Sequence, residues 1–155
     1  MAKIELLENM RVERMRLMEA IGEVRVELAD MPCSPGDWSM KDLIAHMAAW
    51  EEEALQRLLL IKDGRGREIR YIQDEELDRW NAQAVAVRQS LSWEQVLIEF
   101  SAVRERLLET IEDISEEQLA DEVGEVPVAH WLANSTYSHD EEHLPDIVTW
   151  LRGRT

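Results

Sequence analysis

Residues 38–51 read WSMKDLIAHMAAWE, and this stretch predicts where a helix begins and which of its faces is buried. Ser39 can accept a hydrogen bond at the helix start, and Asp42 stands three residues later, at the position of a capping-box acid. From there apolar residues recur every three or four positions, which is the period of one helix face. This buried stripe consists of Leu43, Met47, Trp50, Ala54, Leu58 and Ile61. The charged, glycine-containing run 62–67 is expected to end the helix.

The same helical period continues on both sides of this stretch. Residues 4–31 predict a helix that ends where two prolines and a glycine interrupt the pattern, at residues 31–37. Residues 74–111 predict either one broken helix or two stacked pieces, because a second capping box begins at Ser92. A third capping box at Ser115 predicts a further short helical turn.

The last helix is expected to run from Pro127 to about Arg152, after a loop at residues 123–126. Pro145 should kink it, because proline has no N–H to bond the carbonyl one turn earlier. No segment shows the sustained alternation that predicts a strand. The sequence therefore predicts an all-α four-helix bundle with a broken third helix and short connecting helices, forming a single domain over residues 1–155.

Composition limits the classes to which the protein can belong. Its 155 residues are 45% hydrophobic, which is enough for the core of one domain and too much for a disordered chain. With 17 Lys+Arg and 33 Asp+Glu, the formal net charge is −16. Nucleic acid and anionic membrane surfaces would repel so acidic a surface, so we expect neither among the partners.

The sequence predicts neither a secretory leader nor a membrane span. The N-terminus, MAKIELLEN, has acids where a signal peptide needs an apolar run, and no apolar run approaches about 18 residues. The chain has one cysteine, Cys33, so no intrachain disulfide and no cysteine-based zinc site can form. We therefore expect a cytoplasmic protein in which Cys33 is an ordinary loop residue.

The placement of the histidines is the most informative feature of the sequence. His139 and His143 are four residues apart, which on a helix puts their rings on one face, about 40° apart around the axis. Ile147 and Trp150 share that face, so both rings are expected to point into the bundle. His130 is about half a turn out of phase with His139 and is expected to point elsewhere.

His46 adds a third candidate ligand from a different helix. It lies at the edge of the buried stripe in its helix, and inward positions on different helices meet in a bundle core, where metal sites are commonly built. Three neutral imidazoles leave coordination positions open for water or substrate, and Zn²⁺, Ni²⁺, Fe²⁺ and Mn²⁺ all accept such ligands. Spacing alone is equally compatible with surface histidines or with a hydrogen bond in the core.

Three stretches resemble the DinB-like (DinB/YfiT) superfamily of four-helix bundles, and the resemblance extends over nearly the whole chain. Residues 38–51 match its pattern W-S-x-x-D-x-x-x-H-x-x-x-W. Residues 134–147, NSTYSHDEEHLPDI, carry its H-x-x-x-H counterpart. Residues 88–94, RQSLSWE, are also similar to members of this group.

The resemblance implies a site and a chemistry. It implies that His46, His139 and His143 bind a divalent metal, most often nickel or zinc. Its known branches include transferases that use bacillithiol or mycothiol, proteins like the mycothiol-dependent maleylpyruvate isomerase, and the ClbS/DfsB branch, which is linked to resistance against a genotoxic metabolite. We therefore expect a metal-dependent thiol S-transferase or hydrolase that acts on a small electrophile, with a low-molecular-weight thiol as partner.

Two other functions fit the same features. The chain could sequester a metal or a small ligand without turnover, or it could be a structural bundle whose role is to form a homodimer. Related bundles are often dimers, and a homodimer is therefore an expected assembly for this chain. The sequence does not indicate which thiol, substrate or metal is used.

Polar and aromatic residues near the histidines each have two interpretations. Asp42 could orient the His46 ring, but we expect it to cap its helix. Glu53 could accept a proton near the metal, but residues 51–53 are expected to be a solvated run. Trp50 could wall a substrate pocket, whereas core packing is expected for the tryptophans in general. Further residues considered as partners of a ring are Ser135, Thr136, Glu142 and Asp146.

Overall fold

The protein is almost entirely helical. The computed structural model describes residues 2–32, 37–123 and 126–153. Its α-helices are α1 (Lys3–Ile21), α2 (Met40–Lys62), α3 (Leu77–Ala86), α4 (Trp93–Asp113), α5 (Glu116–Ala120), α6 (Val128–Ser135) and α7 (Tyr137–Arg152). The shorter elements are the 3-10 helices η1 (Val26–Leu28), η2 (Gly66–Glu68) and η3 (Asp74–Glu76), and the strands β1 (Glu122–Val123) and β2 (Val126–Pro127).

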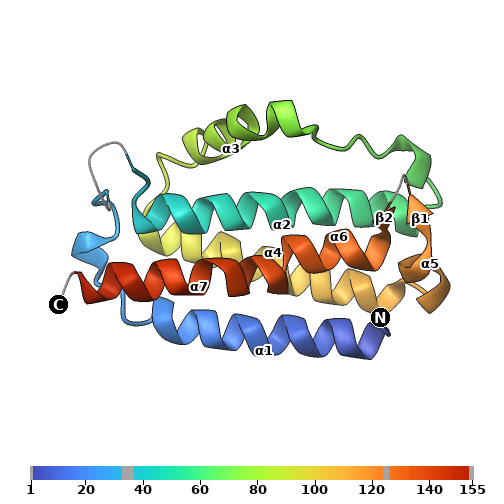
Figure 1. Cartoon of the computed structure of the whole chain (residues 1–155), viewed down its shortest axis with the longest axis horizontal. Coiled ribbons are helices and arrows are strands. Elements are labelled where there is room, and N and C mark those ends of the chain that lie inside the picture. The colour runs from blue at the N-terminus through green and yellow to red at the C-terminus, as the bar shows by residue number, and fades with distance from the viewer. Residues whose placement is uncertain (1, 33–36, 124–125, 154–155) are drawn as a thin grey trace.

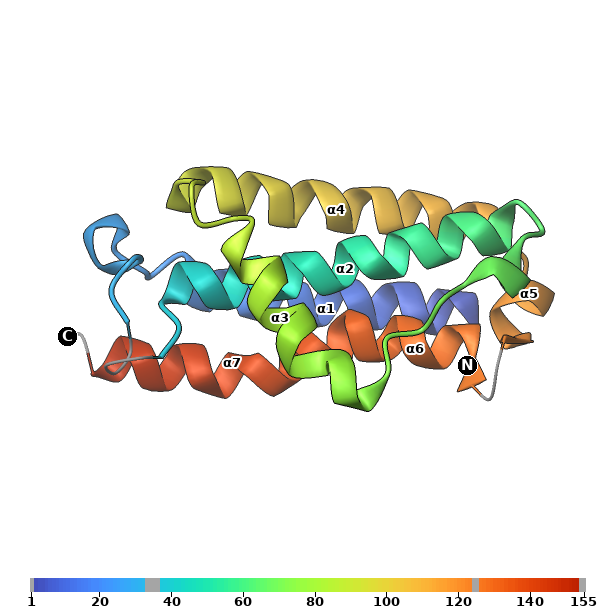
Figure 2. The same ribbon diagram turned by 90° about the horizontal axis from the view of Figure 1, so that it is seen from above.

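Four helical segments run side by side and form a bundle (Figures 1 and 2). They are α1, α2, α4 and the consecutive pair α6–α7, with α2 packed against α4 and α1 against α7. α3 lies outside this bundle and packs on α2. The predicted all-α four-helix bundle with a broken third helix and short connecting helices is confirmed, and α3 and α4 are two separate pieces.

The capping boxes begin helices where the sequence predicts them. Before α2, the Asp42 N–H donates to Ser39 Oγ at 3.1 Å, and the Ser39 N–H donates back to Asp42 Oδ2 at 3.0 Å. Ser92 and Ser115 cap α4 and α5 in the same reciprocal way. Each box satisfies two backbone N–H groups that the helix itself leaves without partners.

The hydrophobic core forms two clusters along the length of the bundle. One packs the first half of α1 against the second halves of α2 and α4 and against α6. The other packs the second half of α1 against the first halves of α2 and α4 and against the end of α7. Large side chains that are fully buried in them include Leu6, Met10, Leu55, Leu58, Leu107, Met40, Ile44, Met47 and Phe100. Each such side chain contributes roughly 1.5–3 kcal/mol through burial, so these clusters hold the helices together.

The first helix is shorter than predicted. It ends at Ile21 rather than near Met31, and the chain then turns and continues as η1. Gly22 is a poor helix former because its backbone is too free, and the β-branched Val24 and Val26 that follow lose side-chain freedom in a helix. The apolar period continues past Gly22, which is why the sequence pattern alone predicted a longer helix.

The last helix is interrupted at a different residue from the one predicted. Thr136, with φ −119° and ψ −99°, separates α6 from α7, whereas Pro145 lies inside α7. The Thr136 hydroxyl donates to the Leu132 carbonyl at 2.6 Å, one of the local bonds by which threonine competes with the helical backbone. The break therefore falls nine residues before the proline, directly ahead of the histidine pair.

A minimal hairpin flanks the loop predicted at residues 123–126. Glu122 pairs with Pro127, and Val123 pairs with Val126, in antiparallel register. Pro127 was predicted in the first turn of the last helix, whereas it belongs to β2 and stands one position before the first residue of α6. Strands of two residues are too short to show the alternation by which strands are predicted.

Candidate metal centre

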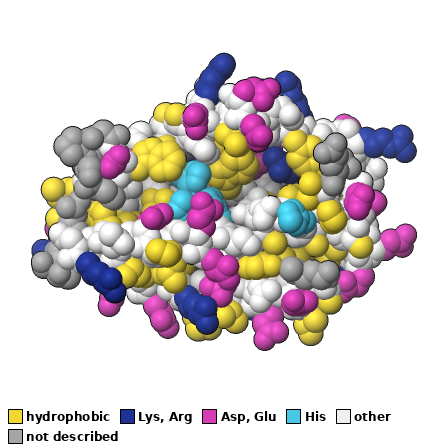
Figure 3. All heavy atoms as spheres, viewed as in Figure 1, with side chains coloured by type: hydrophobic (Ala, Val, Ile, Leu, Met, Phe, Trp, Pro, Cys, Tyr) yellow, Lys and Arg dark blue, Asp and Glu magenta, His cyan; other side chains and the backbone are white. Residues whose placement is uncertain are grey.

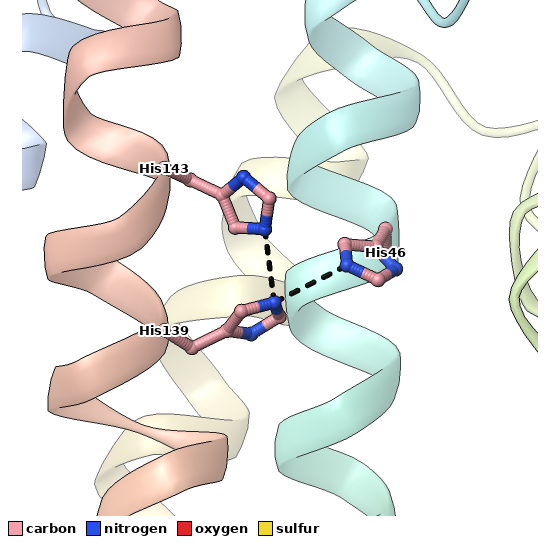
Figure 4. Close-up of side chains that lie close together, drawn as sticks. All are labelled: His46, His139 and His143. Atoms are coloured by element: carbon pink, nitrogen blue, oxygen red, sulfur yellow. Dashed lines mark hydrogen bonds between the residues drawn. The ribbon is translucent and has the colours of Figure 1, made fainter. Parts of the chain in front are cut away.

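Three histidines converge between α2 and α7 (Figure 4). His139 Nε2 lies 3.2 Å from His46 Nε2 and 3.0 Å from His143 Nε2. Each ring offers a nitrogen that lies within 4.8 Å of those offered by the other two. The structure thus brings together the three residues proposed as ligands, while His130 is exposed on α6 and does not belong to this group.

Helix geometry accounts for the convergence. His139 and His143 are one turn apart on α7, and their ring centroids lie 4.6 Å from each other. The break at Thr136 ends α6 and allows α7 to begin as a separate helix. The first turn of α7 is closed by the Asp140 N–H, which donates to the Thr136 carbonyl at 2.9 Å. The His46 ring on α2 then faces both, with centroids 5.0 and 5.5 Å from theirs.

Burial and electrostatic repulsion lower the pKa of two of the rings, those of His46 and His139, and so favour their neutral form. Burial lowers the pKa of His46 from 6.5 to about 4, and the neighbouring His143 adds to the effect. Burial lowers the pKa of His139 further, to about 3, with additional repulsion from the two other histidines and from Arg14 and Arg104. A neutral imidazole has a free lone pair, which is the form in which histidine binds a metal.

Neighbouring side chains orient two of the rings. His143 Nδ1 lies 3.0 Å from Asp146 Oδ2, and because an ionised carboxylate only accepts, Nδ1 carries the proton and Nε2 keeps its lone pair facing the cluster. The Trp38 ring lies 4.9 Å from the His46 ring and covers it, although Trp38 itself is 36% exposed. His46 Nδ1 is buried and makes no hydrogen bond with the residues that the structure describes.

The donor set fits a divalent transition metal. Nitrogens bound to one metal at about 2.0–2.1 Å, and about 90–109° apart, are separated by about 2.8–3.4 Å. The two measured separations, 3.0 and 3.2 Å, fall within this range. Without a metal, His139 Nε2 has one proton or one lone pair to share between two neighbouring nitrogens, so the cluster cannot satisfy all its groups internally.

A buried ionic cluster lies beside the histidines, and the sequence analysis did not identify it. Its members are Arg14 on α1, Glu51 on α2, Arg104 on α4 and Asp140 on α7. Arg104 donates to Glu51 at 2.7 and 3.2 Å and to Asp140 at 3.1 Å. Arg14 donates to Asp140 at 3.2 Å and also bonds Glu51. The Glu51 side chain is only 1% exposed, so the expectation that residues 51–53 are a solvated run is wrong for this residue.

A signal for this cluster is present in the helical periodicity. Arg14 stands four residues after the buried Met10 and three before the buried Leu17. Arg104 likewise stands four residues after Phe100 and three before Leu107. Arginines at core positions of two helices require buried acids as partners, because an unpaired buried charge is very costly.

The tryptophans divide between the core and the surroundings of the histidines. Trp93, Trp131 and Trp150 are buried, as core packing predicts. Trp50 is half-buried, packs on Trp80 with ring centroids 4.3 Å apart, and donates its N–H to Asn81 Oδ1 at 2.8 Å. The aromatic ring in contact with His46 is that of Trp38.

The remaining residues considered from sequence have other contacts. Asp42 acts as the predicted cap, and its second oxygen accepts a hydrogen bond from Gln89 at 2.7 Å. Glu53 lies 3.3 Å from Arg57 on the same helix. Cys33 lies outside the described residues.

The fold and the site together define a four-helix bundle protein with a candidate three-histidine metal centre. The chain belongs to the DinB superfamily, whose family profile matches residues 9–147, and the resemblance seen in the sequence is thereby confirmed. A comparison with curated protein sequences finds no match.

Solved structures share the fold over nearly the whole chain. An uncharacterised protein from Escherichia coli UTI89 is 15% identical, with a TM-score of 0.89 over 99% of this chain and 94% of its own. DfsB, described as a sibling lethal factor precursor, is 16% identical, with a TM-score of 0.84 over 99% and 97%. The colibactin self-resistance protein ClbS is 17% identical, with a TM-score of 0.86 over 96% and 94%. At these identities the likeness establishes the fold alone.

One of these structures corrects an expectation about partners. ClbS is crystallised in complex with a dsDNA, so the exclusion of nucleic acid as a partner, drawn from charge, is wrong for this fold. A net charge of −16 averages over the entire surface, whereas contact with DNA depends on the local charge at the contact. As for membranes, none of the helices among the described residues is long and apolar enough to span one.

Proposed function

We propose that His46, His139 and His143 bind one divalent metal ion and that the protein uses it to act on a small electrophilic molecule. The observation that carries the proposal is the convergence of three imidazole nitrogens, with His139 Nε2 lying 3.2 Å from His46 Nε2 and 3.0 Å from His143 Nε2. Two of these ligands come from α7 and one from α2. Because the protein supplies three ligands, coordination positions remain for water or for a further ligand. We expect nickel or zinc, as the resemblance implies, and iron or manganese would also be compatible with these ligands.

When bound, such a metal lowers the pKa of a water or thiol ligand and so supplies a nucleophile near neutral pH. The chain's own residues support that chemistry. Asp146 holds the His143 ring, and the half-exposed Trp38 beside His46 offers an apolar wall to a substrate. Figure 3 shows the histidines in a hollow of the surface, with hydrophobic side chains on either side and acidic side chains adjacent.

The proposed reaction is transfer of a low-molecular-weight thiol to the electrophile, or hydrolysis of it. The description of ClbS as a colibactin self-resistance protein supports a protective function for this related bundle.

The experiment is an assay of metal-reconstituted protein with bacillithiol, mycothiol or no thiol, against epoxide and activated-halide electrophiles. We expect loss of electrophile that requires the metal and disappears in His139→Ala. His130→Ala is the matched control, because His130 is an exposed histidine outside the cluster, and it should retain full activity. Stoichiometric binding of the electrophile without turnover would instead support the sequestering function, and equal activity in His139→Ala would contradict the proposal.

A further inference from the structure

Arg57 is a buried cation that the proposed metal centre does not use. Its side chain on α2 is 9% exposed, and its Nε donates to Glu53 Oε1 at 3.3 Å. A guanidinium carries five N–H groups in a planar fork, four of them on the two terminal nitrogens. Among residues 2–32, 37–123 and 126–153 no acceptor bonds those four, so the end of the fork keeps unused hydrogen-bonding capacity.

Aromatic side chains hold this guanidinium in place. Its central carbon lies 4.9 Å from the centre of the Tyr71 ring and 5.8 Å from that of Trp131. Tyr71 is fixed in turn, because its hydroxyl donates to the Val123 carbonyl at 2.7 Å. A cation that is already ordered loses little further freedom when an anion binds, which is the usual condition for a useful binding residue.

The helix places Arg57 on the same face as His46. Eleven residues correspond to about three turns, so the two side chains leave α2 within about 20° of each other, at positions about 16 Å apart along the axis. Glu53 lies between them on that face. Long helical side chains lean toward the N-terminus, and the contact of Arg57 with Glu53, one turn earlier, shows this lean toward the histidines.

The space-filling view agrees with this placement. Figure 3 shows histidine, hydrophobic and basic side chains together on one face of the molecule. Arginine recognises carboxylate and phosphate groups because its fork matches two of their oxygens at once. A buried, ordered and incompletely paired arginine in this position is therefore suited to an oxyanion.

We infer that Arg57 forms an anion subsite, which binds a carboxylate or phosphate group at the far end of an elongated ligand whose other end reaches the histidines. The binding of the anion depends only on Arg57 and its surroundings. The statement that the same ligand reaches the histidines rests on the proposed function. Glu53 partly neutralises the guanidinium, so we expect the subsite to bind anions weakly. Its main effect should be to fix the position of the anionic end of the ligand.

The test is titration of the purified protein with succinate and, separately, with inorganic phosphate, followed by NMR chemical shifts. We expect saturable binding that is at least tenfold weaker in Arg57→Met, and the stronger of the two anions identifies the preferred group. Arg88→Met is the matched control, since Arg88 already donates to Glu99 at 2.7 Å and to the Ala84 carbonyl at 3.0 Å. It should bind like the unaltered protein.

Two further variants make the result decisive. Glu53→Gln removes the competing carboxylate and should bind the anions severalfold more tightly, which tests the subsite even if Arg57→Met does not fold. The variant with alanine at all three histidines should bind them unchanged, and this separates the subsite from any anion bound to a metal. Absence of saturable binding, equal binding by Arg57→Met, or loss of binding in the triple-histidine variant would overturn the inference.

Discussion

The histidine cluster and the ionic cluster lie beside each other, and they differ in whether their polar groups find partners within the protein. Asp140 directly follows His139, and Glu51 follows His46 by five residues, so α2 and α7 contribute to both. Two guanidiniums and two carboxylates complete one another in the ionic cluster. In the histidine cluster, Asp146 is a partner for His143 Nδ1, but the Nε2 atoms of the three rings face one another, and three like groups cannot satisfy each other in this way.

This difference assigns different roles to the two clusters. A buried group whose partners are all present stabilises one arrangement of the helices and needs nothing further. Buried imidazole nitrogens that lack hydrogen-bond partners can instead be satisfied by a bound ligand such as a metal ion. We therefore expect changes in the ionic cluster to act on folding, and changes in the histidine cluster to act on metal binding.

The largest expected effect comes from breaking the ionic cluster. Arg104→Met leaves one guanidinium for two buried carboxylates and should lower the free energy of unfolding by about 3–5 kcal/mol, measured by urea denaturation. Arg11→Met is the control, because Arg11 forms an exposed pair with Glu112 at 3.5 Å and should have little effect. Equal stability of the two variants would show that the ionic cluster does not hold the helices.

The second prediction concerns acid. The pKa values of His46 and His139 are lower in the folded protein than the ordinary histidine value of 6.5. As the pH falls below 6.5, these two histidines therefore take up protons in the unfolded chain before they do so in the folded protein. The free energy of unfolding of the metal-free protein should therefore fall as the pH falls from about 6.5 toward 4 and 3, and this contribution should level off below those values. The loss should be on the order of a few kcal/mol.

The variant with alanine at His46, His139 and His143 provides the comparison. It should lose less stability over the same pH interval, because the rings that resist protonation are gone. Denaturation curves at several pH values measure this. If the slope of stability against pH is the same in both proteins, the histidine cluster is not the source of the acid sensitivity.

The third prediction concerns the metal. A metal that binds only the folded chain should raise the free energy of unfolding by about 2.7 kcal/mol when present at 100 times its dissociation constant. Thermal unfolding with and without added nickel or zinc should show this stabilisation in the unaltered protein and in Arg11→Met. The same metal should leave the unfolding temperature of the triple-histidine variant unchanged, and an equal increase there would place the metal elsewhere.

The smallest effect is expected from the residue that orients a ligand. Asp146→Asn replaces the carboxylate that accepts from His143 Nδ1, and it should weaken metal binding by about 10–100-fold, measured by competition with a chelator. The folded state should be little affected, because the Asp146 side chain is 64% exposed. Unaltered metal affinity would mean that His143 needs no partner to keep its orientation.

Much of the fold follows from local sequence signals. Serine caps and apolar stripes predict α2, α4 and α5, because capping bonds and helix faces depend on residues only a few positions apart. The break at Thr136 and the early end of α1 at Gly22 were not predicted. In both places the apolar period continues through the interruption, and the deciding contacts are backbone and side-chain bonds that periodicity does not detect.

The two clusters also differ in how far local sequence signals predict them. The histidine group was predicted from the four-residue spacing of His139 and His143 and from the position of His46 at the edge of a buried stripe, and the resemblance implied the same three ligands. The ionic cluster joins residues from four helices, with Arg14 and Asp140 separated by 126 positions. Glu51 stands four residues after Met47 and three before Ala54, which is a core position, but its place in a run of three glutamates favoured a solvated interpretation. The arginines on the apolar stripes are the signal that buried acids must lie opposite them.

The most direct test of the account is the metal content of tag-free protein, measured by mass spectrometry after exposure to nickel, zinc, iron(II) and manganese(II). The account predicts close to one metal ion per chain in the unaltered protein and in His130→Ala, and none in the variant with alanine at His46, His139 and His143. If the unaltered protein takes up none of these metals, or if the triple variant takes up as much, the three histidines are not a metal centre.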